Sequence, residues 1–308
     1  MSVNSQIQNQ NQTVISPAKQ NQKPNFFVRW LCLLLRSKTG TIGLIIVLAV
    51  TLVAIFAKSL APHDPNLINP TMMLQPPVWA DGGSSAHILG TDNLGRDILS
   101  RIIYGSQISL AVGISAVALA GVIGVFVGLI AGYYGGLIDN ILMRLVDSFL
   151  AIPTILFALV ILSIFGPSVT TLIVVLGITN WVQYARLVRG EVLSIKEREF
   201  VKAAKSIGVR NNKIIMKHLL PNVISPFIVI STLSVATTII LEASLSFLGL
   251  GIQPPTISWG GILSDGRDYI ATSWWLAAFP GMAITITVLA IIFLGDWLRD
   301  VLDPRANN

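Results

Sequence analysis

The sequence predicts an all-α membrane protein with six transmembrane helices and with both termini on the cytoplasmic side. Of its 308 residues, 53% are hydrophobic and only 12% are charged, and the mean hydropathy is +0.72. Soluble domains carry about 25% charged residues, so a chain this apolar needs lipid as its solvent. Because lipid cannot satisfy free backbone N–H and C=O groups, each apolar run is expected to form a helix.

The expected spans are apolar runs that reach across a bilayer, some of them only with their flanks. A span needs about 20 residues, because each residue adds about 1.5 Å across a hydrocarbon core of about 30 Å. The first run is not expected to be a cleaved signal peptide, because 40 residues precede it and no small-residue cleavage site follows. The expected spans are 41–57, 109–131, 149–165, 170–188, 223–243 and 275–294.

Lysine and arginine fix the orientation of these spans. With the N-terminus inside, the inner segments and Arg186 at the inner end of the fourth span hold 17 basic residues, and the outer segments hold four. Cytoplasmic loops carry such an excess of basic residues. Membrane insertion therefore accounts for the net charge of +6, and a nucleic-acid partner is not needed. The four outer basic residues are Lys58, Arg96, Arg101 and Arg267.

The termini differ in character from the membrane domain at 41–305. Residues 1–27 are polar and rich in Gln and Asn, which is typical of a disordered cytoplasmic tail. Residues 28–40 form an amphipathic segment that is expected to lie on the inner membrane surface, and 306–308 form a short C-terminal tail. The single cysteine, Cys32, excludes an intrachain disulfide.

Three connections between the spans carry patterns of their own: the outer segments 58–108 and 248–274, and the inner loop 189–222. Long loops with internal patterns are where function concentrates. With one cysteine and three histidines outside the spans, no metal site is expected.

The inner loop is expected to form two short helices joined at Gly208, which suits a left-handed helix C-cap. Ala203 and Ala204 are small and permit another backbone to approach closely, while Pro221 opens the next span, where a missing N–H costs little. Two short helices at the cytoplasmic surface could transmit a movement from a soluble partner to the spans. The expected apolar faces are Phe200, Val201, Ala204 and Ile207 on the first helix, and Ile214, Ile215, Leu219 and Leu220 on the second.

The outer segment before the second span carries alternating charges. Asp92, Arg96 and Asp97 are expected to form a local ion-pair cluster among glycines that allow tight turns. Two roles stay open for these residues: a folded collar at the membrane surface, or contact with a partner or substrate.

Within the spans, the sequence offers a packing stripe and a few polar groups. Gly124, Gly128 and Gly132 recur every fourth residue, with Gly121 nearby, which favours a close helix interface. Polar residues inside a membrane are candidates for function. They mark a translocation path here, although Glu242 lies near the outer end of its span and could simply face water. The polar candidates are Asn180, Gln183 and Glu242.

The inner loop resembles the EAA loop of permeases from bacterial ATP-binding-cassette (ABC) importers. The resemblance lies in the order and spacing of three features. Ala203-Ala204 is followed after three residues by Gly208, and nine residues further on comes a segment that ends in Leu220-Pro221. In that family the loop docks as a coupling helix in a groove of the ATPase subunit. This chain departs from the pattern at Lys202, where Glu is expected, and at His218, where Ile is usual. The resemblance assigns ATPase coupling to Glu199, Lys202, Ala203, Ala204, Gly208, Leu220 and Pro221.

The outer segments resemble the dipeptide, oligopeptide and nickel branch of that family, in its "C"-type subunit. The signature His-x-x-Gly-Thr-Asp-x-x-Gly-Arg-Asp begins at His87, and further similar stretches bring the resemblance to about residues 28–305. Pro76-Pro77-Val-Trp79 and Ser273-Trp274-Trp275 look most similar to dipeptide permeases. The residues assigned to an outer collar or partner contact are His87, Gly90, Thr91, Asp92, Gly95, Arg96, Asp97, Trp259 and Asp265.

The resemblance implies a type I ABC importer permease in the inner membrane of a bacterial cell. It implies import of dipeptides or short oligopeptides by alternating access, with nickel or haem-type cargo as the alternative. The implied partners are a homologous permease subunit that completes a heterodimer, two ATPase subunits of the same or different kind, and a periplasmic or lipid-anchored peptide-binding protein. ATP and Mg would bind the ATPase subunits, and this chain would hold no cofactor.

Two other classes of function fit the sequence poorly. A secondary transporter acting alone would need an ion-coupling site or paired broken helices, and the spans hold almost no charge. An enzyme would need a catalytic motif, and the sequence contains neither His-Glu-x-x-His nor Gly-x-Ser-x-Gly. It also lacks Gly-x4-Gly-Lys-Ser/Thr, so this chain is not expected to bind ATP through a P-loop.

Overall fold

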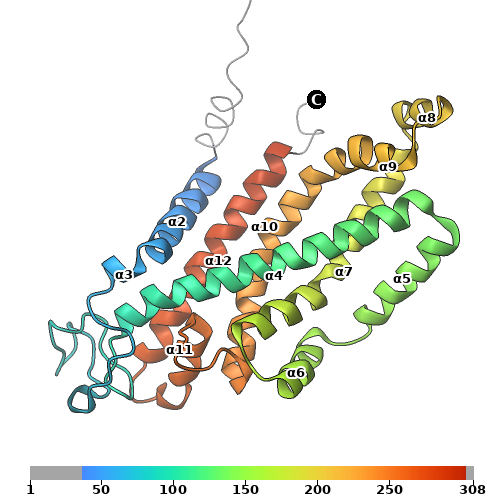
Figure 1. Ribbon diagram of the computed structural model, residues 1–308. Helices are drawn as coiled ribbons and strands as arrows, with labels where there is room; N and C mark the ends of the chain where they lie inside the picture. Colours follow the sequence, from blue (N-terminus) through green and yellow to red (C-terminus); the bar gives the residue numbers. More distant parts are fainter. Residues whose placement is uncertain (1–36, 303–308) are drawn as a thin grey trace, which may run out of the picture.

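The computed structural model describes residues 37–302. The expected tails at 1–27 and 306–308, most of the amphipathic segment 28–40, and Cys32 lie outside the described residues. Within 37–302 the chain is helical, and its strand-type pairing is one isolated bridge between Thr91 and Asp97. The long helices lie beside one another, with shorter helices at both ends of the bundle (Figure 1).

Five helices are long and apolar enough to cross a membrane. Their cores match five of the expected spans, and most extend beyond the apolar run because polar residues continue the helix outside the lipid. The longest, α4, has 37 residues and begins 11 residues before the expected span. The five are α2 (Lys38–Ile55), α4 (Ile98–Tyr134), α7 (Val169–Lys196), α10 (Leu220–Leu245) and α12 (Trp275–Leu302).

The third expected span, 149–165, is not one straight helix. The structure replaces it with α5 (Gly136–Leu150) and α6 (Thr154–Phe165), which meet at an angle of 83°. Pro153 separates them, because proline lacks an N–H and disfavours helical geometry in the residue before it. Only α6 has the continuous apolar composition that predicts a span, and its 12 residues reach about 18 Å.

The bent pair is nevertheless one crossing. On α4, Gly124 faces Tyr184 of α7, and Gly132, two turns further on, faces Val192. Residue numbers therefore increase in the same direction along both helices, so α4 and α7 are parallel. The α5–α6 segment between them must return across the membrane, which gives six crossings in total.

The glycine stripe on α4 is a helix interface, as the sequence predicts. A Cβ atom on Gly124 would lie 2.3 Å from Cβ of Tyr184, and one on Gly128 would lie 2.7 Å from the carbonyl oxygen of Ala185. Gly121 instead faces the ring of Phe227 on α10. Glycine therefore lets the backbones of α4 and α7 come into close contact.

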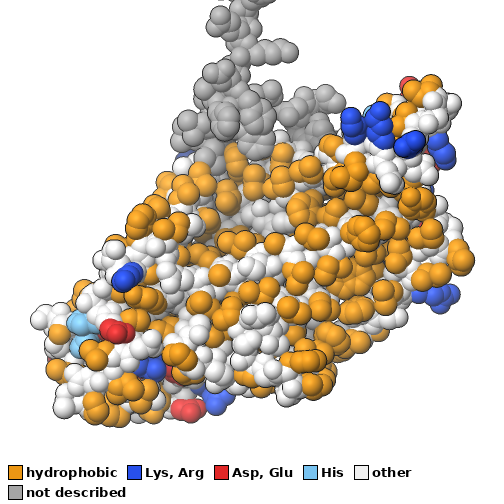
Figure 2. Space-filling model, viewed as in Figure 1, with side chains coloured by type: hydrophobic (Ala, Val, Ile, Leu, Met, Phe, Trp, Pro, Cys, Tyr) orange, Lys and Arg blue, Asp and Glu red, His pale blue; other side chains and the backbone are white. Residues whose placement is uncertain are grey.

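Polar segments gather at the two ends of the molecule. The helix α8 (Glu199–Ser206) and α9 (Asn211–Ile214) lie at the end where α4 finishes. The segment 58–97 and α11 (Trp259–Asp265) lie at the opposite end (Figure 1). Hydrophobic side chains cover the helices between these ends, and the charged side chains concentrate towards the ends (Figure 2). This arrangement agrees with the sidedness predicted from lysine and arginine.

The remaining short elements belong to these two ends. At the outer end they are α3 (Ala57–Leu60), η1 (Pro70–Met72), the π-turn η3 (Ser246–Leu250) and η4 (Arg267–Tyr269). At the inner end a second π-turn, η2 (Ile215–Leu219), connects α9 to α10.

Gly124→Ala is expected to lower the unfolding temperature of the purified chain. The added methyl meets backbone and Cβ atoms of α7, and such overpacking costs about 1–3 kcal/mol. The matched control is Gly190→Ala on α7, where nothing lies within 4 Å of the new Cβ. Equal unfolding temperatures for the two variants in the same detergent would contradict the close contact.

Candidate functional site

The inner loop has the two short helices that the sequence predicts. The first, α8, ends at Ser206, and Gly208 follows with φ +77°, in the left-handed region that favours glycine. The amide N–H of Val209 then donates to the carbonyl of Ala204 at 3.1 Å, which closes the end of the helix. The chain turns into α9 and passes through η2 into α10, with Pro221 in the first turn.

One side of the loop is buried, but not the whole face that the sequence predicts. Val201 and Ala204 are 3% and 8% exposed, and Val201 belongs to a cluster with buried residues of α7, α9 and η2. Phe200 and Ile207, which were expected on the same apolar side, are 43% and 81% exposed. Ile207 follows the last residue of α8, where the backbone leaves the helix. The apolar side chain of Ile207 is therefore exposed at the tip of the loop.

One polar bond joins the loop to the inner end of α4, and a second joins the inner ends of α4 and α7. Tyr133 at the end of α4 donates its hydroxyl to Oδ1 of Asn211 at 2.7 Å. Lys196 at the end of α7 donates to the carbonyl of Gly132 at 3.0 Å. A displacement of α9 would therefore act on the end of α4, which is itself bonded to the end of α7, and the loop and the two helices are expected to move together.

Lys202 has a partner inside the loop. Its Nζ lies 2.9 Å from Oε2 of Glu197, and this hydrogen bond from Lys202 holds the pKa of Glu197 below its usual range. Both side chains are largely exposed. Lys202, which stands where the EAA pattern expects Glu, is therefore paired with the carboxylate of Glu197.

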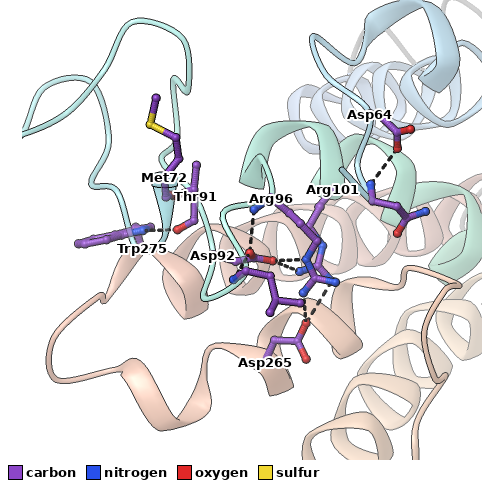
Figure 3. A network of polar contacts seen from close by, with 10 residues as sticks. Asp64, Met72, Thr91, Asp92, Arg96, Arg101, Asp265 and Trp275 are labelled. Atoms are coloured by element: carbon purple, nitrogen blue, oxygen red, sulfur yellow. Dashed lines mark hydrogen bonds and ion pairs between the residues drawn. The ribbon is translucent and has the colours of Figure 1, made fainter. Parts of the chain in front are cut away.

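At the opposite end, the outer collar is held by buried charges (Figure 3). We define it as residues 61–101 with α11. Asp92, which is 1% exposed, accepts from Nε of Arg96 at 2.6 Å and from the guanidinium of Arg101. The same two arginines donate to Oδ2 of Asp265 at 3.2 and 3.1 Å. Two arginines held between two aspartates thus join the start of α4 to α11.

The predicted cluster of Asp92, Arg96 and Asp97 is only partly correct. Asp92 and Arg96 pair, but Asp97 faces away from them. It caps α4 by accepting from the N–H of Ser100 at 2.8 Å, and its other oxygen lies 3.0 Å from Nδ1 of His87. Sequence reasoning did not select Arg101 for the site. The available signal was that it follows Asp97 by one helical turn in a charged outer segment.

The collar backbone is folded tightly around Thr91. The Thr91 hydroxyl donates to the carbonyl of Met72 and accepts from the N–H of Gln75, and its own carbonyl accepts from Nε1 of Trp275 at 3.2 Å. Gly95 has φ +74°, and a Cβ there would lie 1.9 Å from the carbonyl oxygen of Asn69. The predicted need for glycine at this tight turn is confirmed. Gly90 likewise has φ +81°.

Trp259 ties α11 to α4 through two bonds. Its backbone N–H donates to Oγ of Ser109 at 3.0 Å, and its indole N–H donates to the carbonyl of Ile102 at 2.9 Å. The residue is 2% exposed, so within this chain it positions α11.

Glu242 does not face water, which corrects one of the alternatives drawn from the sequence. It is 1% exposed, and its Oε1 accepts from the hydroxyls of Ser246 and Ser258 at 2.9 Å each. Ser258 is also the N-cap of α11. The carboxyl group of Glu242 therefore links α10 to the start of α11.

The other two polar candidates lie elsewhere. Gln183 is exposed on α7, and its Nε2 lies 3.5 Å from Oγ of Ser234, while Asn180 is half-buried one turn earlier. Ser234 precedes Glu242 by eight residues, about 12 Å along α10. The three residues therefore do not form one cluster.

Comparison with known proteins identifies the family. Residues 124–308 match the family described as "Binding-protein-dependent transport system inner membrane component". Residues 30–77 match the "N-terminal TM domain of oligopeptide transport permease C".

The chain belongs to the family of binding-protein-dependent permeases.

Several relatives are similar to this permease over most of their length. The dipeptide transport system permease protein DppC of Escherichia coli (strain K12) is 45% identical over 88% of this chain and 90% of the relative. The DppC of Alkalihalophilus pseudofirmus is 44% identical over 88% and 87%. The di/tripeptide transport system permease protein DppC of Pseudomonas aeruginosa is 41% identical over 86% and 88%.

Among solved structures, the permease is similar to a chain of the MetNI methionine ABC transporter in inward-facing conformations. The TM-score is 0.54 at 22% identity, with 66% of this chain and 96% of that chain covered. This likeness shows the type I importer fold. The family and the relatives show that the chain is a multi-pass inner-membrane permease of the C type, a subunit of an ABC importer. Such permeases work with ATPase and binding-protein partners.

Asp92→Asn is expected to destabilise the permease by about 3–5 kcal/mol, because it leaves two buried arginines without their central carboxylate. Asp268→Asn is the matched control. That aspartate is 77% exposed and pairs with Arg267 at the surface, where an ion pair is worth at most about 1 kcal/mol. Thermal unfolding of both variants in detergent measures the difference. Equal shifts would show that the buried cluster does not hold the collar.

Glu242→Gln is expected to lower the unfolding temperature less than Glu242→Ala does and to preserve transport, because the amide oxygen can still accept from Ser246 and Ser258. Glu242→Ala is expected to lower the unfolding temperature, since each buried hydroxyl left without an acceptor costs about 1–3 kcal/mol. Unfolding temperature and substrate uptake are both measured. A Gln variant that is stable but transports nothing would instead show that transport requires an ionisable group at position 242.

Proposed function

We propose that this chain is the permease subunit through which dipeptides and short oligopeptides enter the cytoplasm by alternating access. The observation that carries the proposal is the 41–45% identity, over 86–88% of the chain, to relatives named for dipeptide or di/tripeptide transport. Permeases of one branch that share this much sequence are expected to share the class of cargo.

The inner loop is the proposed contact with the ATPase subunits. Its exposed tip combines apolar Ile207 with the basic residues Lys202 and Lys205, and its buried side rests on α7, α9 and η2. A displacement of the tip would reach the inner end of α4 through the bond from Tyr133 to Asn211, and the end of α7 through the bond from Lys196 to Gly132. The proposed coupling residues are Glu199, Lys202, Ala203, Ala204, Gly208, Leu220 and Pro221.

ATP and Mg are proposed to bind two separate ATPase subunits, of the same or different kind, and the chain itself is proposed to hold no cofactor. The energy of hydrolysis would enter this subunit only as movement of the inner loop.

The outer collar is proposed to hold the outer ends of α4, α10 and α12 beneath a peptide-binding protein that is periplasmic or lipid-anchored. Its charges are satisfied mainly within the chain, which supports a structural role for Asp92, Arg96 and Arg101. Asp265 has a side chain that is 37% exposed, and it is the charged member of the cluster best placed to meet a partner.

A second, homologous permease subunit is proposed to complete the translocation path as a heterodimer. Gln183 is exposed on α7, as a path-lining residue would be in the isolated subunit, and Asn180 lies one turn from it. Glu242, which is buried within the chain, would shape the path by positioning α11.

Gly208→Val is expected to reduce ATP-dependent uptake of a labelled dipeptide by at least about tenfold. A β-branched residue at φ +77° is strained, with a cost of about 1–2 kcal/mol or more for a left-handed backbone, so the loop would change shape. Uptake is measured in membrane vesicles that contain the complete transporter. The control is Ser206→Ala, which removes only an exposed hydroxyl bonded to the carbonyl of Lys202.

Both variants should reach the membrane in normal amounts, because the apolar helices are unchanged. Wild-type uptake by the Gly208→Val variant would contradict the proposed coupling role of the loop.

A further inference from the structure

A group of metal-ligand side chains lies in the outer collar, apart from the ion-pair cluster. His63 lies in the segment after α3, His87 lies in the loop before Thr91, and Asp97 caps α4. One ligand atom from each residue lies within 4.8 Å of the others. The two imidazole rings have centroids 4.8 Å apart at an angle of 39°. Both histidines lie in the outer collar, but the proposed transport mechanism assigns no chemistry to either imidazole.

The distances in this group suit a small metal ion. Nδ1 of His87 lies 3.0 Å from Oδ1 of Asp97, and Nδ1 of His63 lies 3.8 Å from Oδ2. Ligand atoms about 2.0–2.2 Å from a tetrahedral Zn²⁺ lie about 3.3 Å from one another. The two observed separations, each to a different oxygen of Asp97, lie on either side of that value.

An unpaired nitrogen favours a ligand over a simple His–Asp pair. Nδ1 of His63 is buried and has no hydrogen-bond partner. A buried polar atom without a partner is costly, and coordination of a cation by its lone pair would remove that cost. His87 alone would have sufficed for an ordinary hydrogen bond to Asp97.

Ser100 does not belong to the group itself, but it is hydrogen-bonded to two of its three residues. Its hydroxyl donates to Oδ2 of Asp97 at 2.6 Å and accepts from the backbone N–H of His63 at 3.0 Å. Residues that orient the ligands in this way are typical of metal sites. One buried serine therefore positions two of the three ligand residues.

We propose that His63, His87 and Asp97 bind a divalent transition-metal ion, with Zn²⁺ as the best match. Two imidazoles and one carboxylate form a ligand set that zinc accepts, with a fourth position left for water. His63 also lies on the wall of a cavity of about 590 Å³, from which that water can enter. The ion would fasten the segment after α3 to the first turn of α4.

The spacing in the sequence does not reveal this site. The two histidines are 24 residues apart, and Asp97 follows His87 by ten, which matches no short metal motif. The expectation of no metal site rested on the small number of cysteines and histidines, and the fold brings two of the three histidines to one carboxylate.

The test is a calorimetric titration of ZnCl₂ into the purified full chain in detergent, produced without a histidine tag. We expect one Zn²⁺ per chain for the wild type. His63→Ala and Asp97→Asn are each expected to weaken binding by more than about tenfold, because even loss of a residue that only orients a ligand costs about 10–100-fold. Asn caps helices as well as Asp does, so Asp97→Asn should keep the start of α4 folded.

The matched control is His218→Ala, which removes the third histidine, at the inner end and outside the group. Its affinity for Zn²⁺ should equal that of the wild type. The proposal is overturned if the wild type binds no stoichiometric Zn²⁺, if His63→Ala and Asp97→Asn bind as tightly as the wild type, or if His218→Ala weakens binding as much as His63→Ala does.

Discussion

The close backbone contact between α4 and α7 is the constraint on which the rest of the structure depends. Glycines at positions 124, 128 and 132 allow it, and the two parallel helices force the bent α5–α6 pair to return across the membrane. The 37 residues of α4 reach about 55 Å, well beyond a hydrocarbon core of about 30 Å. The same helix therefore contacts the inner loop at one end and the outer collar at the other. Movement of a packed pair as one body is a common way to couple distant ends of a protein.

Much of the fold could be predicted from sequence, because lipid leaves a chain few alternatives. Apolar composition predicted six spans, of which five are single long helices, the asymmetry of lysine and arginine predicted their sidedness, and the glycine stripe predicted a close helix interface. The third span could not be predicted in detail. Hydropathy finds continuous apolar runs, whereas this crossing combines the amphipathic α5 with the short α6 beyond Pro153.

The candidate site was predictable where its chemistry is local along the chain. Gly208 has the left-handed backbone that its place after a short helix predicts, and Asp92 pairs with Arg96 one turn away. Contacts between distant segments had no local signal. Arg101 meets Asp265 from 164 residues away, and only the packed structure shows it. The exposure of Ile207 could not be predicted either. Its side chain follows the last residue of α8, so the helical period no longer determines which way it faces.

Reconstitution into liposomes tests the central claim most directly, namely that this chain is a peptide permease driven by separate ATPase subunits. The complete transporter, with its partner permease, ATPase subunits and binding protein, is compared with this chain alone, and accumulation of a labelled dipeptide is measured with and without ATP. The account predicts accumulation only by the complete transporter and only with ATP. Accumulation by the chain alone, driven by an ion gradient without ATP, would contradict it.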